Sequence, residues 1–188
     1  MDMWRPYKSV ATEVFPNAEI VIDKFHLVAV MNTALDEIRK QEQNQLSQFH
    51  RKKFYMSRIL MKKRGEDLTD KEHKRLIELF KLSPPLEKAW ELKEEFRDLM
   101  QIVSLNEAKI ALEQWYKRIT ESKLSPFFKA KGIKRWELHI LNCFKSKITN
   151  GFAEGINNKI KLIKRIGYGV PNLQNLRRRV FHSILRIS

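Results

Sequence analysis

Apolar residues recur at spacings of three and four along most of the chain, the pattern of helices with one buried face. The clearest stripe comprises Leu27, Val30, Met31, Ala34, Leu35 and Ile38. Further stripes predict helices at 70–81, 86–103, 106–122 and 133–144, with a polar and basic helical stretch at 41–64. A shorter helix is predicted from Pro6 to Phe15. The pattern therefore predicts a mainly α protein.

Turn residues and caps divide these stripes. Thr69 followed by Glu72 predicts a capping box for the helix that begins at Asp70, and Ser83-Pro-Pro85 is expected to break that helix. Ser125-Pro126 is expected to turn the chain again.

One segment has the pattern of a strand. Ile20-Val-Ile22 is β-branched and is bounded by Pro16-Asn17 and Asp23. A lone strand cannot satisfy its own backbone groups and needs a sheet partner. Nothing later in the sequence resembles such a partner, so we expect the partner strands to precede Met1.

A basic helix near the end contains a single carboxylate. Phe152, Ile156, Ile160 and Ile163 form its apolar stripe, and Gly167 is a plausible stop. The opposite face comprises Glu154, Asn158, Lys161 and Arg165. Glu154 is the only acid between residues 138 and 188, where ten lysines and arginines lie. It is either a charge-pairing residue or a metal ligand beside a polyanion. After Pro171-Asn172 a last helix is expected, with Arg177, Arg178 and Arg179 together.

Charge and composition narrow the classes of partner. The net charge of +15 and a pI near 10.0 favour an anionic partner, most often nucleic acid, over a basic structural role. No apolar run approaches the roughly 20 residues that span a bilayer. The single cysteine, Cys143, lies in an apolar run and is expected in the core of a cytoplasmic protein. Charges between 41 and 104 nearly balance and alternate in sign, which indicates solvated helical hairpins rather than a nucleic-acid groove.

Catalytic chemistry, if present, must come from carboxylates. The sequence has no Cys/His cluster for zinc, and its five histidines are scattered. Phosphoryl transfer on DNA commonly uses two Mg²⁺ ions held by acids from separate chain segments. Asp2 and Asp23 flank a helix and strand, and Glu154 lies on the basic helix. The pattern alone does not separate these acids from ordinary surface charge.

Several motifs resemble those of one family. They are Met1-Asp-Met-Trp-Arg-Pro-Tyr7, Phe15-Pro-Asn-Ala-Glu-Ile-Val-Ile-Asp-Lys-Phe-His26, Thr149-Asn-Gly-Phe-Ala-Glu-Gly-Ile-Asn-Asn-Lys-Ile-Lys161, Lys164-Arg165, Gly167-Tyr-Gly169, Ala89-Trp90, Trp115 and Ile140-Leu-Asn142. Together they closely resemble the ISL3 family of bacterial insertion-sequence transposases. These are DDE enzymes with an RNase H-like catalytic domain.

The resemblance implies a role for particular residues. Asp2 would be the second metal-binding acid and Glu154 the third, holding Mg²⁺ or Mn²⁺. Asp23 and His26 would support the site, as would Asn157 and Asn158. DNA contacts would come from Lys159, Lys161, Lys164, Arg165, Arg177, Arg178 and Arg179. The implied partners are transposon ends and target DNA, with homo-oligomers possible and no membrane, in a cytoplasmic, nucleoid-associated protein.

The same resemblance implies a division of the chain. Residues 1–40 would be the back part of an RNase H-like domain with one strand, 41–141 a large helical insertion, and 142–188 the return to the catalytic domain. The family's first catalytic aspartate would precede Met1, so we expect a C-terminal part that does not cut or join DNA alone.

Two other hypotheses stay open at this point. One is a non-enzymatic, basic, helical nucleic-acid-binding protein in which Glu154 only pairs with Asn158 or Lys161. The other is a basic structural protein without a specific partner. Metal binding distinguishes a transposase from the nucleic-acid-binding protein. The salt dependence of DNA binding distinguishes both of these from the basic structural protein.

Overall fold

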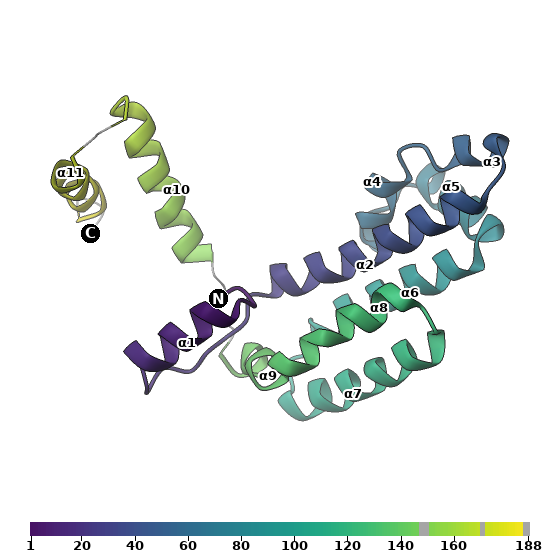
Figure 1. The fold of residues 1–188 in the computed structure, drawn as a ribbon, viewed down its shortest axis with the longest axis horizontal. Coiled ribbons are helices and arrows are strands. Elements are labelled where there is room, and N and C mark those ends of the chain that lie inside the picture. The colour runs from purple at the N-terminus through teal and green to yellow at the C-terminus, as the bar shows by residue number, and fades with distance from the viewer. Residues whose placement is uncertain (147–150, 170–171, 186–188) are drawn as a thin grey trace. The chain divides into compact units, whose positions relative to one another are not determined.

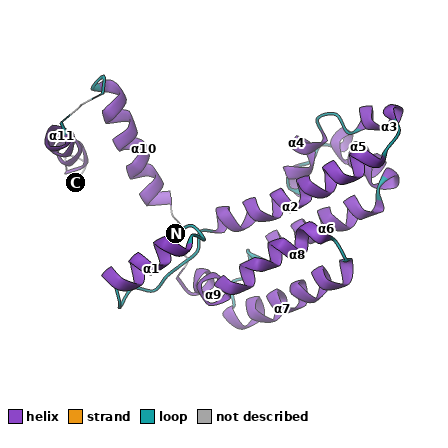
Figure 2. Ribbon diagram, viewed as in Figure 1, coloured by secondary structure: helices purple, strands orange, loops and turns teal. Residues whose placement is uncertain are grey.

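A computed structural model describes residues 1–146, 151–169 and 172–185, with the side chains of Ser146, 152–154 and Leu185 outside the description. The chain divides into two compact units, Met1–Ile148 and Thr149–Ser188. Figures 1 and 2 show that helices and connecting loops make up the described residues, among which there is no strand. The prediction of a mainly α protein is confirmed.

The first unit is a helical bundle preceded by a helix and an extended segment. Its elements are α1 (Arg5–Val14), α2 (Lys24–Gln45), α3 (Gln48–Lys53), α4 (Ser57–Lys62), the 3₁₀ turn η1 (Gly65–Asp67), α5 (Asp70–Leu82), α6 (Pro84–Leu99), α7 (Leu105–Ser122), α8 (Ser125–Ala130), the 3₁₀ turn η2 (Lys131–Trp136) and α9 (Glu137–Ser146). Helix α2 is the long central element, and it packs against α4, α6 and α8 (Figure 1).

The stripe predicted on α2 is its buried face. Leu27, Met31, Leu35 and Ile38 are at most 3% exposed, and they join the core with residues of α6 to α9. The facing side of α6 and α7 is filled by Phe96 and Trp115, whose ring centroids are 4.6 Å apart. Phe96 and Trp115 are therefore core residues of the bundle.

Caps explain where several helices begin. The predicted capping box forms, with both Thr69 and Glu72 bonded to each other's backbone N–H. Ser83 accepts a hydrogen bond from the backbone N–H of Leu86, so the Ser-Pro-Pro run begins α6 directly as α5 ends. Proline suits the first turn of a helix because its missing N–H would have no intrahelical partner there. The same rule accounts for α8, a short helix with Pro126 in its first turn where only a turn was predicted.

The strand predicted at Ile20–Ile22 does not form. The segment is extended, and its backbone groups find other partners. The Asn142 side chain donates to Ile20 O (2.8 Å), and Ile22 N–H donates to His139 O (3.2 Å). Ile22 is 1% exposed against α9, so burial and these bonds hold the segment without a sheet.

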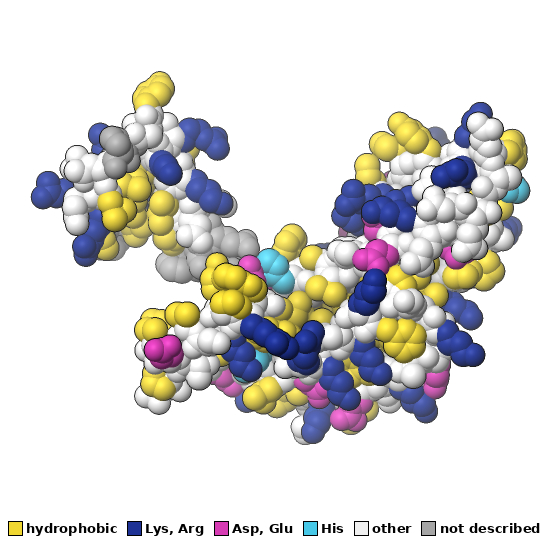
Figure 3. Space-filling model, viewed as in Figure 1, with side chains coloured by type: hydrophobic (Ala, Val, Ile, Leu, Met, Phe, Trp, Pro, Cys, Tyr) yellow, Lys and Arg dark blue, Asp and Glu magenta, His cyan; other side chains and the backbone are white. Residues whose placement is uncertain are grey.

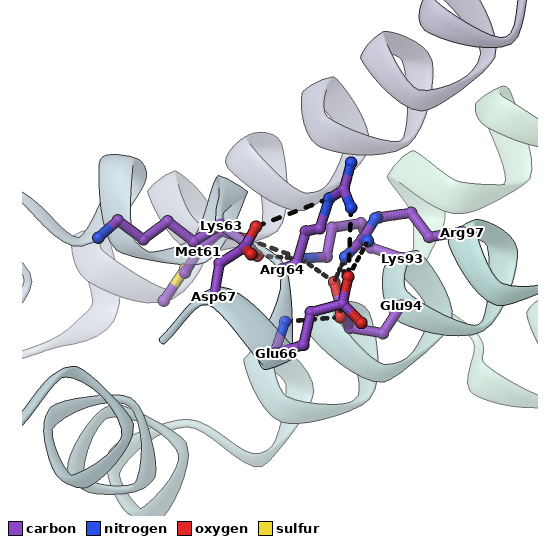
Figure 4. A network of polar contacts seen from close by, with 9 residues as sticks. Met61, Lys63, Arg64, Glu66, Asp67, Lys93, Glu94 and Arg97 are labelled. Carbon is purple, nitrogen blue, oxygen red and sulfur yellow. Dashed lines mark hydrogen bonds and ion pairs between the residues drawn. The ribbon is translucent and has the colours of Figure 1, made fainter. Parts of the chain in front are cut away.

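The core also contains a charged side chain, that of Lys93. The side chain of Lys93 on α6 is fully buried, and its Nζ donates to Met61 O (3.0 Å) and Lys63 O (2.9 Å). Glu94 Oε1 lies 2.5 Å from the same Nζ. Glu94 also accepts from the backbone N–H of Gly65 (2.8 Å) and from Arg97 (Figure 4). This network joins α6 to the end of α4 and to η1.

The second unit is a hairpin of α10 (Gly151–Ile166) and α11 (Leu173–Leu185). The predicted stripe residues Ile156, Ile160 and Ile163 are half-buried, and none of the unit's described side chains is fully buried. Helix α10 ends one residue before Gly167, as predicted, and Gly169 follows in the left-handed region (φ 76°). This unit therefore presents most of its polar surface to its surroundings.

Candidate active site

Asp2 and His26 form a polar pair at the start of α2. His26 Nε2 lies 2.6 Å from Asp2 Oδ1, where the imidazole N–H donates to the carboxylate. Both side chains are partly exposed, at 35% for His26 and 47% for Asp2. The structure places these two side chains together, and the second carboxylate oxygen of Asp2 accepts no hydrogen bond within the described residues.

Two backbone hydrogen bonds place Asp2 beside α2. The amino group of Met1 donates to Val21 O (2.7 Å), and Asp23 N–H donates to Met1 O (3.1 Å). These bonds bracket Ile22 in the evenly slanted pattern of neighbouring parallel strands. The Cys143 thiol, whose pKa is raised by burial, donates to Ile22 O from the other side (2.7 Å). Cys143 is a buried core residue, as predicted.

Asp23 has a capping role in this arrangement. Its carboxylate accepts from Phe25 N–H (3.0 Å) as the N-cap of α2. Its carbonyl accepts from the backbone N–H of His26 (3.1 Å), in the first turn of the same helix. Asp23 therefore fixes the position of His26, which in turn holds Asp2.

A cavity of about 480 Å³ opens beside this pair. Its apolar lining includes Trp4, Val30 and Ala34 of α2, and Ala130 of α8. Thr33, Glu37 and Lys129 add polar groups, and the Lys129 Nζ lies 3.8 Å from Glu37 Oε2. Sequence reasoning missed Thr33, Glu37 and Lys129 because no motif marks them; only the packing of α8 on α2 brings them together.

This region offers some of the ligands that a divalent metal ion needs, but not a complete set. Asp2 offers a carboxylate oxygen, the ligand type that Mg²⁺ prefers. However, the residues with described side chains include no group of three His, Cys, Asp or Glu that could hold a metal ion. The side chain of Glu154, the other predicted ligand, lies outside the described residues. The described part of the chain thus supplies one carboxylate and its histidine support, without a complete ligand set.

Most of the predicted DNA-contacting cations on α10 and α11 are exposed. They are Lys161, Lys164, Arg165, Arg177, Arg178 and Arg179. Lys159 differs, since its Nζ donates to Ser183 O (2.7 Å) and ties α10 to α11. Asn157 and Asn158 are exposed on α10, where the described residues show no hydrogen bond from either side chain.

Comparison with known proteins identifies the family. The sequence profile of the ISL3 family of DDE-type proteins, described as Transposase, matches residues 1–180. The chain belongs to the ISL3 transposase family. It is 31% identical over 173 residues to the transposase for insertion sequence element IS1001 of Bordetella parapertussis, a match covering 90% of this chain and 43% of that protein.

Two further relatives are also transposases of an insertion sequence. The transposases for insertion sequence element IS1557 of two Mycobacterium tuberculosis strains are each 28% identical over 191 residues, covering 89% of this chain and 43% of theirs. The chain thus spans less than half the length of the curated relatives that it matches. No solved structure matches the chain. Within the described residues, no helix is both long enough and apolar enough to cross a membrane.

Proposed function

We propose that this chain is part of the machinery that cleaves and joins DNA in an insertion-sequence transposase, with Asp2 and Glu154 as two of its metal-binding acids. The observation that carries the proposal is the Asp2–His26 pair at the rim of a cavity, in a chain of the ISL3 family. The paired backbone bonds of Met1 around Ile22 support an RNase H-like arrangement, in which a neighbouring parallel strand would extend this pairing.

Each group has a defined task in this proposal. A bound Mg²⁺ or Mn²⁺ would supply charge stabilisation and activate a water or hydroxyl nucleophile. Asp2 would bind the ion through its free oxygen, while His26 fixes the carboxylate through the other oxygen. Asp23 holds His26 in place through the helix cap. Exposed cations of α10 and α11 would bind DNA phosphates and set the register of the strand.

Metal binding gives a direct test. The chain should bind Mn²⁺, and Asp2→Asn or Glu154→Gln should abolish measurable binding because each removes a charged ligand. His26→Gln should weaken binding by about 10- to 100-fold, since a residue that orients a ligand typically has an effect of this size. Isothermal titration with Mn²⁺, supported by electron paramagnetic resonance of the bound ion, measures all three.

Glu13→Gln is the matched control, because Glu13 is exposed on α1 and forms no ion pair within the described chain. It should bind Mn²⁺ like the wild type. Unchanged binding by Glu154→Gln would exclude Glu154 as a ligand and favour a non-enzymatic nucleic-acid-binding protein.

Strand transfer gives the second test. The resemblance implies a site of three acids, and this sequence supplies two of them, so the chain alone should not join terminal-repeat DNA to a target. A gel assay with Mg²⁺ or Mn²⁺ should show no joined product above background. Product that disappears in Asp2→Asn would show instead that the chain completes its site by itself.

A further inference from the structure

Although the charges between 41 and 104 nearly balance in total, the cations and the acids are concentrated in different parts of this stretch. Residues 43–65 contain seven lysines and arginines and no acid, whereas residues 66–104 contain ten acids and seven cations. The basic part folds as α3, α4 and the turn between them, here called the α3–α4 lobe (residues 47–64). The charge balance that indicated solvated hairpins rather than a nucleic-acid groove is therefore absent from this lobe.

The cations of the lobe are largely available to a ligand. Arg51, Lys52, Lys53 and Lys62 are exposed, and no carboxylate of a described residue lies within ion-pair distance of them. Arg58 reaches only Asp36, at 3.6 Å, and that carboxylate is already bonded to Arg39 and Lys40. Two further cations of the lobe form ion pairs with nearby acids. Lys63 pairs with Glu72, and Arg64 pairs with Glu66 and Asp67.

Exposed aromatic and apolar side chains lie among these cations. Phe49 is 71% exposed and Tyr55 74%, and Met56 and Ile59 are each more than half exposed. The lobe is nevertheless held firmly, because its other face buries Phe54, Leu60 and Met61, and Arg75 donates to the Tyr55 carbonyl. Figure 3 shows hydrophobic and basic side chains gathered at the α3–α4 end of the bundle. Basic groups beside exposed aromatic rings are the features with which proteins hold single-stranded nucleic acid.

A second cavity borders the lobe and shares lining residues with the cavity at the candidate active site. A cavity of about 470 Å³ is lined by Lys40, Arg58 and Lys62 and by residues of α2, including Ala29 and Thr33. Ala29 and Thr33 also line the cavity beside Asp2 and His26. The two cavities therefore follow one side of α2, from its first turn to the α3–α4 lobe.

We propose that the α3–α4 lobe is a second DNA-binding surface, which holds the phosphate backbone with its cations and unpaired bases with Tyr55 and Phe49. The inference rests on the proposed action of the chain on DNA. From His26 to Lys40 the helix rises about 21 Å, at 1.5 Å per residue. With about 3.4 Å between successive phosphates along a duplex strand, the lobe contacts DNA about six nucleotides from the phosphate at Asp2.

A second copy of the chain is a poorer fit to this surface. Two lobes facing each other would each bring four exposed cations that have no carboxylate partner among the described residues, and like charges at such proximity repel. A polyanion is the complementary partner, and exposed aromatic rings add affinity for nucleobases in particular.

The contribution of the lobe's cations to DNA binding is tested with two sets of four substitutions, each made in the full chain. The lobe set is Arg51→Gln, Lys52→Gln, Lys53→Gln and Lys62→Gln. The control set removes the same charge from exposed, unpaired lysines elsewhere in the described bundle: Lys71→Gln, Lys74→Gln, Lys88→Gln and Lys109→Gln. Fluorescence anisotropy with a 30-nucleotide DNA, single-stranded and duplex, measures affinity against salt.

The lobe set should weaken duplex binding at least ten-fold at low salt and flatten the plot of log affinity against log salt by about three to four units, since each lost phosphate contact removes about 0.9. The control set should change affinity less than two-fold. Equal losses in both sets would overturn the inference, because only net charge would then matter. No binding by the wild-type chain at low salt would refute the proposed function itself.

The aromatic part is tested separately. Tyr55→Ala with Phe49→Ala should weaken single-stranded DNA binding about five-fold or more, while duplex binding changes less, because stacking needs unpaired bases. Phe15→Ala is the control, since Phe15 is 63% exposed at the end of α1 and outside the lobe. Loss of duplex and single-stranded affinity in the same ratio would overturn the stacking role and leave a phosphate contact alone.

Discussion

Replacing Glu94 with alanine is expected to lower the free energy of unfolding of the bundle by about 3–5 kcal/mol, the usual cost of breaking a buried ion pair by removing one partner. The Lys93 ammonium has no exposed surface, and Glu94 is its charged partner at 2.5 Å. Without the carboxylate, the two carbonyl oxygens of Met61 and Lys63 would remain to solvate a full positive charge. The Gly65 N–H would lose its acceptor as well.

The same pair predicts the direction of the pH dependence. Burial raises the pKa of Glu94, but Lys93, the Gly65 N–H and Arg97 outweigh it and hold that pKa below its ordinary value of 4.5. A carboxyl group with a lowered folded-state pKa stabilises the fold above its unfolded pKa and loses that contribution as the pH falls through the folded value. The stability gap between wild type and Glu94→Ala should therefore be full at pH 7 and should narrow as the pH falls below 4.5.

Urea denaturation followed by circular dichroism measures this gap. The control is Glu91→Ala on the same helix, whose carboxylate lies 3.7 Å from Arg118 at an exposed position. Exposed pairs contribute about 0–1 kcal/mol, so this variant should unfold close to the wild type. A loss below about 1 kcal/mol in Glu94→Ala would show that Lys93 becomes neutral or reaches water.

The bundle itself follows from patterns that are local in the sequence. The α2 stripe and the Thr69–Glu72 box each depend on spacings within one helix, so they can be recognised without knowing the partners. Lys93 could not be recognised in this way. Its burial depends on carbonyl groups about thirty residues away, which only the packing of α4 on α6 supplies. By spacing alone it is one more lysine on a charged helix.

For the Ile20–Ile22 segment, the local pattern predicted a strand that the structure does not contain. Its β-branched residues have a local preference for extended backbone, which the structure keeps, but a strand also needs a partner along its length. Among the described residues, only Met1 and residues of α9 bond to the segment. Only the family resemblance led us to expect Asp2 and His26 at one site, because no periodicity links residues in two different elements. The cavity beside them depends on α8, whose existence the sequence did not indicate.

Binding of this chain to duplex DNA should fall by about 10³- to 10⁵-fold between 50 and 200 mM salt, as for proteins that make six to ten phosphate contacts. Two groups of exposed cations lead to this range. Six lie on α10 and α11: Lys161, Lys164, Arg165, Arg177, Arg178 and Arg179. Four more lie on the α3–α4 lobe without a carboxylate partner among the described residues: Arg51, Lys52, Lys53 and Lys62.

The number of contacts decides between the two ends of that range. Six contacts give a slope near −5 in the plot of log affinity against log salt, and ten give a slope near −9. Changing Arg177, Arg178 and Arg179 together to glutamine should flatten the slope by about 3, because three phosphate contacts are removed. A wild-type slope shallower than about −2 would mean that phosphates contribute little. The charge of +15 would then serve a basic structural protein, and both proposed DNA-binding surfaces would be refuted together.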